Sequence, residues 1–136
     1  MTTKLSVVVA SHDRPLRLRW LLNALEEQTL DRSEWEVVVA HDSRGPETEA
    51  LLRDHPLGRD GTLRHVRLTG AAASPGTNRN AAWPLAEAET VVFTDDDCRP
   101  PPEWLERMLA ATRRRASRAP PPAPSDHERA SAPRAR

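Results

Sequence analysis

TVVFTDDD, residues 90–97, is an apolar run that ends in three consecutive aspartates. Its valines, threonines and phenylalanine are typical of a buried β-strand. The carboxylates of Asp95, Asp96 and Asp97 would then lie at the C-terminal end of that strand, where open α/β sheets bind their ligands. This stretch therefore predicts an α/β sheet and also the edge of the sheet that carries a site.

Three adjacent carboxylates repel one another unless a positive charge lies beside them. Hard divalent cations such as Mg²⁺ and Mn²⁺ prefer oxygen ligands and would also meet the phosphates of a nucleotide. The alternative is that the aspartates only cap a helix that begins near Pro101, since acidic residues suit a helix N-terminus. One aspartate would be enough for a cap, so the triple cluster favours a metal site.

Strands and helices alternate along the rest of the chain. Apolar or alternating runs predict strands, and leucines at helical spacing predict helices. Asp13 is placed to cap the first helix, and Pro84 must kink or restart the third. This order predicts a three-layer α/β sandwich with a mostly parallel, Rossmann-like sheet, in which residues 63–68 lie nearer an edge. The expected strands are residues 5–10, 35–40, 63–68 and 90–94, and the expected helices are residues 15–25, 47–54, 71–88 and 101–115.

Residues 116–136 differ in composition from the rest of the chain. Alanine, proline, arginine and serine dominate this segment, and it has no apolar periodicity. Such a segment cannot repay the entropy lost on ordering. We therefore expect one domain over residues 1–115 and a disordered Pro/Ala/Arg-rich tail over residues 116–136. The basic residues 113–115 and Arg118 either complement the dipole of the last helix or contact acidic lipid or RNA.

The chain carries 20 basic and 20 acidic residues, but these charges are unevenly spread. Residues 1–112 hold 13 basic against 18 acidic residues, and residues 113–136 hold seven against two. An acidic body fits metal and nucleotide chemistry and argues against direct binding of nucleic acid. The lone Cys98 fits a reducing compartment. Because no leader or transmembrane stretch is seen, the sequence predicts a cytoplasmic protein.

Four segments, in the same order along the chain, resemble family 2 glycosyltransferases. The first is LSVVV at residues 5–9 with SHDR at residues 11–14, and the second is EVVVAHDS at residues 36–43. The third is residues 70–82, which contain Pro-Gly followed by NRNA, and the fourth is FTDDDC at residues 93–98, followed by PPEWL at residues 101–105. The resemblance spans roughly residues 4–112.

The resemblance implies the glycosyltransferase A fold, of which this stretch would form the nucleotide-sugar-binding half. Asp95 and Asp97 would hold the divalent cation, Mg²⁺ or Mn²⁺, which acts as a Lewis acid on the leaving diphosphate. The donor would be a nucleotide-diphosphate sugar, and a UDP-sugar if a carboxylate accepts from N3–H of the base. The other implied donor-binding residues are Asp96, Ser11 and Asp13 on the nucleotide side, Asp42 near the base, Arg79 near the phosphates or the metal carboxylates, and Asn80, which fixes its loop.

Each of these residues also has a purely structural interpretation. Ser11 and Asp13 are placed to cap the first helix, Asp42 to form a turn, and Arg79 to be a solvated surface residue. The histidines show no metal-ligand spacing, so no zinc site is expected. Cys98 is expected to fill space and not to act as a nucleophile.

Two positions depart from the family pattern. His41 stands where the family commonly has the first of two aspartates, next to Asp42, which is expected to approach the base. Trp83 and Pro84 interrupt the helix that carries Arg79 and Asn80. Neither departure changes the pair of aspartates assigned to the metal.

Family members commonly continue well beyond this point, with residues that supply the acceptor face and a catalytic base. Here the remaining carboxylates fall at the start of the last helix or in the predicted tail, so the catalytic residue and the acceptor stay unassigned. We therefore expect a truncated domain that binds donor weakly and transfers sugar negligibly alone, with a partner chain as one source of the acceptor half. The alternative is a non-catalytic nucleotide-binding module or an inert fragment. The carboxylates in question are Glu103, Glu106, Asp126 and Glu128.

Overall fold

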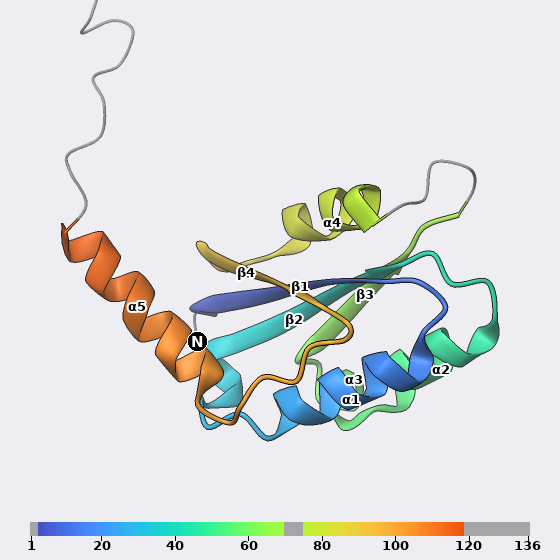
Figure 1. The fold of residues 1–136 in the computed structure, drawn as a ribbon, viewed down its shortest axis with the longest axis horizontal. Helices are drawn as coiled ribbons and strands as arrows, with labels where there is room; N and C mark the ends of the chain where they lie inside the picture. The colour runs from blue at the N-terminus through green and yellow to red at the C-terminus, as the bar shows by residue number, and fades with distance from the viewer. Residues whose placement is uncertain (1–2, 70–74, 119–136) are drawn as a thin grey trace, which may run out of the picture.

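The computed structural model describes residues 3–69 and 75–118 of the chain. Within them, the strands form one parallel sheet of order β3-β2-β1-β4 (Figure 1). The elements in chain order are β1 (Leu5–Ser11), α1 (Pro15–Glu26), β2 (Trp35–His41), α2 (Pro46–Asp54), α3 (Pro56–Arg59), β3 (Leu63–Arg67), α4 (Pro75–Ala82), β4 (Thr90–Asp95) and α5 (Trp104–Arg118), with 3₁₀ turns at Arg32–Glu34 and Trp83–Leu85.

Helices cover both faces of the sheet. Helix α4 lies on one face, whereas α1, α2 and α3 lie on the other, and the first turns of α5 join them there (Figure 1). The predicted three-layer α/β sandwich with a parallel sheet is therefore confirmed. In the described part of the chain, no helix is both long enough and apolar enough to cross a membrane.

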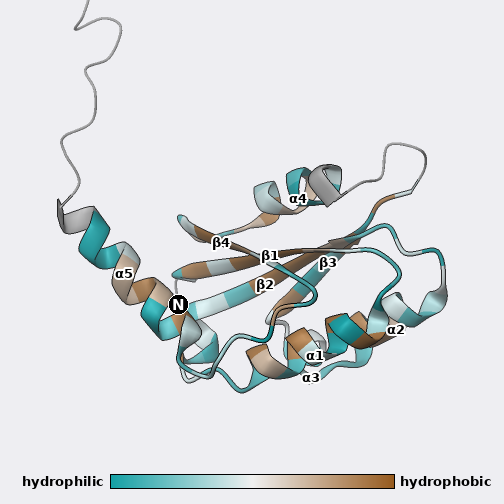
Figure 2. Cartoon of the chain, in the orientation of Figure 1, coloured by the Kyte–Doolittle hydropathy of each residue, from teal (hydrophilic) through white to brown (hydrophobic). Residues whose placement is uncertain are grey.

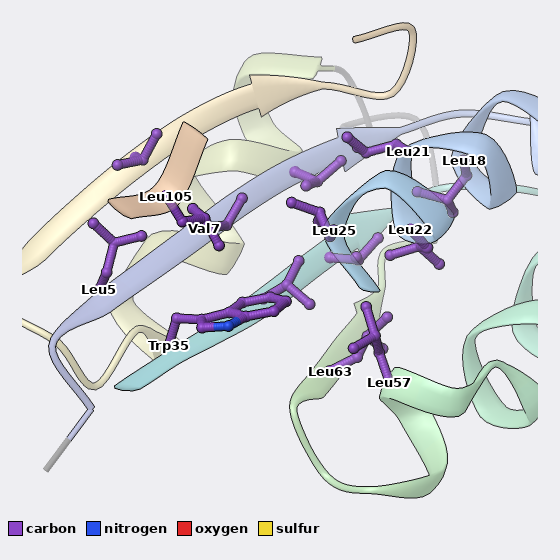
Figure 3. Close-up of a cluster of buried hydrophobic side chains, with 14 of the residues drawn as sticks. Leu5, Val7, Leu18, Leu21, Leu22, Leu25, Trp35, Leu57, Leu63 and Leu105 are labelled. Atoms are coloured by element: carbon purple, nitrogen blue, oxygen red, sulfur yellow. The ribbon is translucent and has the colours of Figure 1, made fainter. Parts of the chain in front are cut away.

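The larger core lies between the sheet and α1. Four leucines of α1, all fully buried, face residues of β1 and β2 that point to the same side (Figure 3). Burial of each such side chain contributes about 1.5–3 kcal/mol. In Figure 2, hydrophobic residues lie along β1 and along part of β2, whereas hydrophobic and hydrophilic residues alternate along α1. The leucines are Leu18, Leu21, Leu22 and Leu25.

The strand ends that carry the candidate site are level with one another. Ser11 at the end of β1 pairs in register with His41 of β2, and Ala10 pairs with Asp95 of β4. Parallel strands present their C-terminal ends at one edge of the sheet. The loops that follow β1, β2 and β4 therefore meet there.

Strand β4 lies at an edge of the sheet, which corrects the prediction that it is buried. Among the described strands it pairs with β1 alone. Val92 is buried under α5, but Phe93 points to the opposite face and is 52% exposed. The apolar run predicted the strand correctly but not its position. Strand β3 lies at the other edge, as its alternating sequence predicted.

Two helices differ in extent from the prediction. Helix α4 ends at Ala82 because Pro84 cannot continue it, and the 3₁₀ turn follows; residues 70–74 lie outside the described part. Helix α5 begins at Trp104 and continues to Arg118, beyond the expected domain boundary at residue 115. Most of the predicted tail, residues 119–136, lies outside the described residues, so its disorder stays a prediction.

Candidate functional site

A cavity of about 500 Å³ opens where β1, β2 and β4 end. It is also bounded by α4, which crosses the sheet above β1 and β2. Four carboxylates and two guanidinium groups line it, so its charge is predominantly negative. The lining residues are Ala10, Ser11, His12, Arg14, Asp42, Asn78, Arg79, Asp95, Asp96 and Asp97.

The three aspartates alternate in direction after β4. Asp96 turns inward and is buried, and Ser11 Oγ donates a hydrogen bond to its Oδ2 at 3.0 Å. Arg14 Nη1 lies 3.9 Å from its other oxygen. Asp95 and Asp97 are exposed to solvent. The pair that was assigned to the metal is therefore the accessible one, and Asp96 is held by protein groups.

Arg79 connects α4 to the end of β4. Its Nη2 donates to Asp95 Oδ1 at 2.7 Å, and its Nε is buried without a hydrogen-bond partner. Arg79 therefore makes a specific contact at the end of β4, with its side chain 43% exposed. A guanidinium with unused donors beside an accessible carboxylate is suited to bind an anionic ligand.

The three aspartates do not cap α5, which begins at Trp104. None of the three donates or accepts at the first turn of α5, where Leu105 N donates to Gln28 Oε1 at 3.0 Å. At the start of α1 the N-cap residue is Arg14, which makes no side-chain cap hydrogen bond. The predicted cap at Asp13 is not formed.

Asp13 instead joins the loop after β1 to the loop after β2. Its backbone N donates to Ser43 Oγ, and its Oδ1 accepts from Arg44 N, both at 2.9 Å. Asp13 also has a positive φ of 45°, a conformation that aspartate tolerates better than most residues. The two loops are thus fixed relative to each other beside the cavity, although Asp13 itself is not part of the lining.

Asp42 places its carboxylate in the cavity next to His12. Its side chain is only 8% exposed, and Oδ1 lies within hydrogen-bond distance of His12 Nδ1. His12 was not predicted as a site residue; it lies in the SHDR segment, directly after Ser11. Asp42 is therefore oriented by a neighbouring ring and not simply part of a turn.

The two asparagines of the NRNA segment have opposite environments. Asn80, which was predicted to fix the loop, is exposed and outside the cavity lining. Asn78 is buried and lines the cavity. Sequence reasoning missed Asn78, and also Arg14, although both lie in segments that it had singled out.

The position of the cavity and its lining residues agrees with the family that the sequence matches. The sequence model of the family described as "Glycosyl transferase family 2" matches residues 6–119.

The chain belongs to glycosyl transferase family 2.

Three similar proteins show what this family 2 chain resembles. The poly(ribitol-phosphate) beta-N-acetylglucosaminyltransferase TarS of Staphylococcus aureus is 32% identical over 94 residues, which are 69% of this chain and 16% of TarS. The crystal structure of S. aureus TarS 1–349 in complex with UDP-GlcNAc superposes with a TM-score of 0.71 at 29% identity, over 84% of this chain and 32% of that one. The mannosyltransferase PcManGT from Pyrobaculum calidifontis, in complex with GDP-Man and Mn²⁺, gives a TM-score of 0.60 at 27% identity, over 71% of this chain and 28% of that one.

The chain spans about a third or less of each of these proteins. The suspected relation to family 2 and the expected glycosyltransferase A type of fold are both confirmed.

No group of three or more histidine, cysteine or carboxylate side chains converges on a metal position within residues 3–69 and 75–118. The two accessible aspartates, Asp95 and Asp97, offer the hard oxygen ligands that Mg²⁺ and Mn²⁺ prefer. Two carboxylates fit a cation that takes its other ligands from phosphate and water, as Mg²⁺ commonly does. The donor set therefore fits a metal shared with a ligand and not a closed protein cage.

The two described candidates for the catalytic base, Glu103 and Glu106, lie outside the cavity lining. Glu106 Oε2 accepts from Thr29 Oγ1 at 2.7 Å, and neither Glu103 nor Glu106 is part of the cavity lining. Asp126 and Glu128 fall outside the described residues. Every carboxylate that does line the cavity is one already assigned to the donor or the metal.

Proposed function

We propose that this chain binds a nucleotide-diphosphate sugar, a UDP-sugar in particular, as the donor half of a glycosyltransferase. The observation that carries the proposal is the convergence of Ser11, Asp42, Arg79 and the three aspartates on one cavity at the ends of three parallel strands. Ligands of open α/β sheets bind at this edge. The resemblance to TarS, which has been crystallised with UDP and with UDP-GlcNAc, supports the choice of nucleotide.

The charge of the cavity argues for a divalent cation. Carboxylates outnumber the two arginines of the lining, and a nucleoside diphosphate adds further negative charge. Asp95 and Asp97 would hold Mg²⁺ or Mn²⁺, and the bound cation would neutralise the diphosphate as it leaves. Arg79, now on Asp95, would share its donors between that carboxylate and the phosphates.

The nucleoside would lie toward β2. Asp42, held by His12, offers a carboxylate oxygen to a donor such as N3–H of uracil. Ser11 and Asp96 form a buried floor between the two ends of the cavity. Asp13 supports this floor through the loop contacts described above, and a direct role for Asn80 is left as a prediction from its motif.

We further propose that the acceptor site and the general base belong to polypeptide outside this sequence, either a continuation of the chain or a partner chain. Inverting transfer needs a base within hydrogen-bond reach of the acceptor hydroxyl. Support comes from the greater length of the relatives and from the assignment of each cavity carboxylate to another role. The location in the cytoplasm rests on the sequence alone.

Calorimetric titration with UDP, UDP-GlcNAc and GDP, each with and without Mn²⁺, tests donor binding. We expect UDP and UDP-GlcNAc to bind more tightly than GDP, and Mn²⁺ to strengthen binding. The double variant Asp95→Asn/Asp97→Asn should lose the Mn²⁺-dependent part, about tenfold or more in Kd, because it removes both anionic ligands.

A matched control is Glu103→Gln with Glu106→Gln, which removes two charges outside the cavity lining. Equal losses in both double variants would show that general charge, and not a metal site, controls binding. Equal affinity for UDP with and without Mn²⁺ would remove the metal from the proposal and leave a nucleotide-binding module.

A further inference from the structure

Asn78 presents to the cavity an amide that the fold leaves without a partner. The residue is only 1% exposed, and neither Nδ2 nor Oδ1 has a hydrogen-bond partner. Among the described residues, Arg79 Nε is the one other buried side-chain atom in this condition. Both residues line the same cavity.

An unpaired buried amide is costly. Leaving a buried donor or acceptor unsatisfied costs about 1–3 kcal/mol, and folded proteins rarely do so without a reason. One turn further along α4, Ala82 packs into the apolar cluster with Val8 and Val38. An apolar residue at position 78 would extend that cluster, so packing does not explain an asparagine there.

The chemistry of the amide limits what can satisfy it. A carboxamide carries donor hydrogens on Nδ2 and an acceptor on Oδ1. Both are used only by a group that can accept and donate, such as a ribose hydroxyl or the imide edge of uracil. A phosphate accepts hydrogen bonds without donating any, so it would leave Oδ1 unpaired.

The position of Asn78 in the cavity also favours a contact with the nucleoside. Helix α4 packs on β1 and β2, and β1 lies between β2 and β4 in the sheet (Figure 1). Asn78 lines the same cavity as Asp42 at the end of β2 and Asp95 at the end of β4. With the diphosphate at Asp95 and Asp97 and the base toward Asp42, the ribose of the nucleoside would lie between them, at the end of β1, the strand on which α4 packs.

We propose that Asn78 binds the nucleoside part of the donor nucleotide through both atoms of its amide and so contributes to nucleotide specificity. This inference rests on the proposed function, because it places the diphosphate and the base as that function does. It assigns a role to Asn78, whereas the family motif predicts a role for Asn80.

The test is calorimetric titration of UMP and of UDP with Mn²⁺ into the wild-type chain and the Asn78→Leu variant. Leucine keeps the branched shape of the side chain and removes both polar atoms. We expect Kd to rise about tenfold for UMP and by the same factor for UDP, since the lost contact is to the nucleoside. We also expect the ligand-free variant to unfold at the same temperature as the wild type or higher, because an unsatisfied amide has been removed.

A structural role would give a different result. If Asn78 only supported α4, Asn78→Leu would lower the unfolding temperature of the ligand-free chain along with the affinity. Asn78→Ala, which cannot overpack the site, repeats the test if the leucine variant folds poorly. Unchanged affinity for UMP, a loss confined to UDP, or a larger loss in Asn80→Ala than in Asn78→Ala overturns the proposal.

Two further comparisons of binding affinity complete the test. If the wild-type chain binds neither UMP nor UDP, the proposed function and this inference fail together; if it binds both and Asn78→Leu binds them equally well, the inference alone fails. Titration with 2′-deoxy-UMP separates the two kinds of nucleoside contact. The missing hydroxyl and the Asn78→Leu substitution each lower the affinity. If the two losses of binding free energy do not add, Asn78 contacts the ribose; if they add, it contacts the base edge.

Discussion

His41 ends β2 as a fully buried imidazole with both ring nitrogens occupied. Nε2 lies 2.8 Å from Glu49 Oε1, and Nδ1 accepts from Ser43 N at 3.3 Å. Because Nδ1 accepts a hydrogen bond, the ring is neutral and its proton is on Nε2. Burial lowers the pKa of His41 and outweighs Glu49, which would raise it; His65 and Arg67 lower it further.

This lowered pKa predicts that the chain loses stability in mild acid. The unfolded chain takes up the proton near the ordinary histidine pKa of about 6.5, whereas the folded chain resists it. The contribution of His41 is therefore fully present above about pH 6.5 and is lost as the pH falls toward the folded pKa. Urea denaturation from pH 7.5 to pH 5 should show a smaller loss of unfolding free energy in His41→Asn than in the wild type.

His55 remains in both chains and acts in the same direction, since burial lowers its pKa as well. The difference between the two pH profiles therefore isolates His41. Parallel profiles would show that His41 does not titrate differently in the folded and unfolded states. The variant keeps an acceptor for Ser43 N, so the loop that carries Asp42 is expected to persist.

For single residues, the sequence predicted which side chains meet at the site better than it predicted which way each side chain points. The strand-end residues Ser11, Asp42 and Asp95 meet as expected, because parallel strands fix where their ends lie. The choice between Asn78 and Asn80 depends on the rotation of α4, which is set where that helix packs on the sheet. The left-handed conformation of Asp13 follows from contacts between two loops and leaves no local sequence signal.

Between elements, a buried carboxylate joins strands on the face that α4 covers. Glu36 of β2 is 6% exposed and accepts hydrogen bonds from Ser6 Oγ of β1 at 2.6 Å, from Arg64 of β3, and from Glu87 N at 2.7 Å. Burial alone would raise the pKa of Glu36, but these hydrogen bonds together lower it. The connection into β4 is thereby tied to three strands.

We predict that Glu36→Ala lowers the free energy of unfolding by about 2–4 kcal/mol, because three donors lose a buried acceptor. Glu34→Ala is the matched control two residues earlier. Glu34 pairs with Lys4 at the surface, where an ion pair contributes about 1 kcal/mol or less. Urea denaturation measures both variants, and equal losses would show that the Glu36 network adds nothing beyond a surface pair.

The extents of the strands were predicted to within one residue, but the position of a strand in the sheet was not always predicted. The apolar runs of β1 and β2 predicted central strands, and both are buried. A similar run in β4 lies at an edge, because burial depends on what pairs beyond it. The short helix α3 falls between the expected helix at residues 47–54 and the expected strand at residues 63–68, in a stretch that contains proline and glycine and for which no element was expected.

Among the described residues, the molecule presents an open strand edge at β4 with an exposed apolar side chain. Strand β4 has no charged residue from Thr90 to Thr94, and Phe93 is 52% exposed. Edges without charge, proline or a bulge favour pairing with another chain. We predict concentration-dependent self-association in sedimentation velocity, and less of it in Phe93→Lys. A control with lysine at the exposed Leu16 of α1 should associate like the wild type; equal suppression by both variants would point to net charge and not to the edge.

The same edge affects how many donor sites a sample contains. Asp95 ends β4, so a neighbouring chain added along this strand would lie beside one of the carboxylates assigned to the cation. Titrations at high protein concentration should then give a stoichiometry below one nucleotide per chain, with an unchanged Kd for the sites that remain open. Dilution, or Phe93→Lys, should bring the stoichiometry back to one.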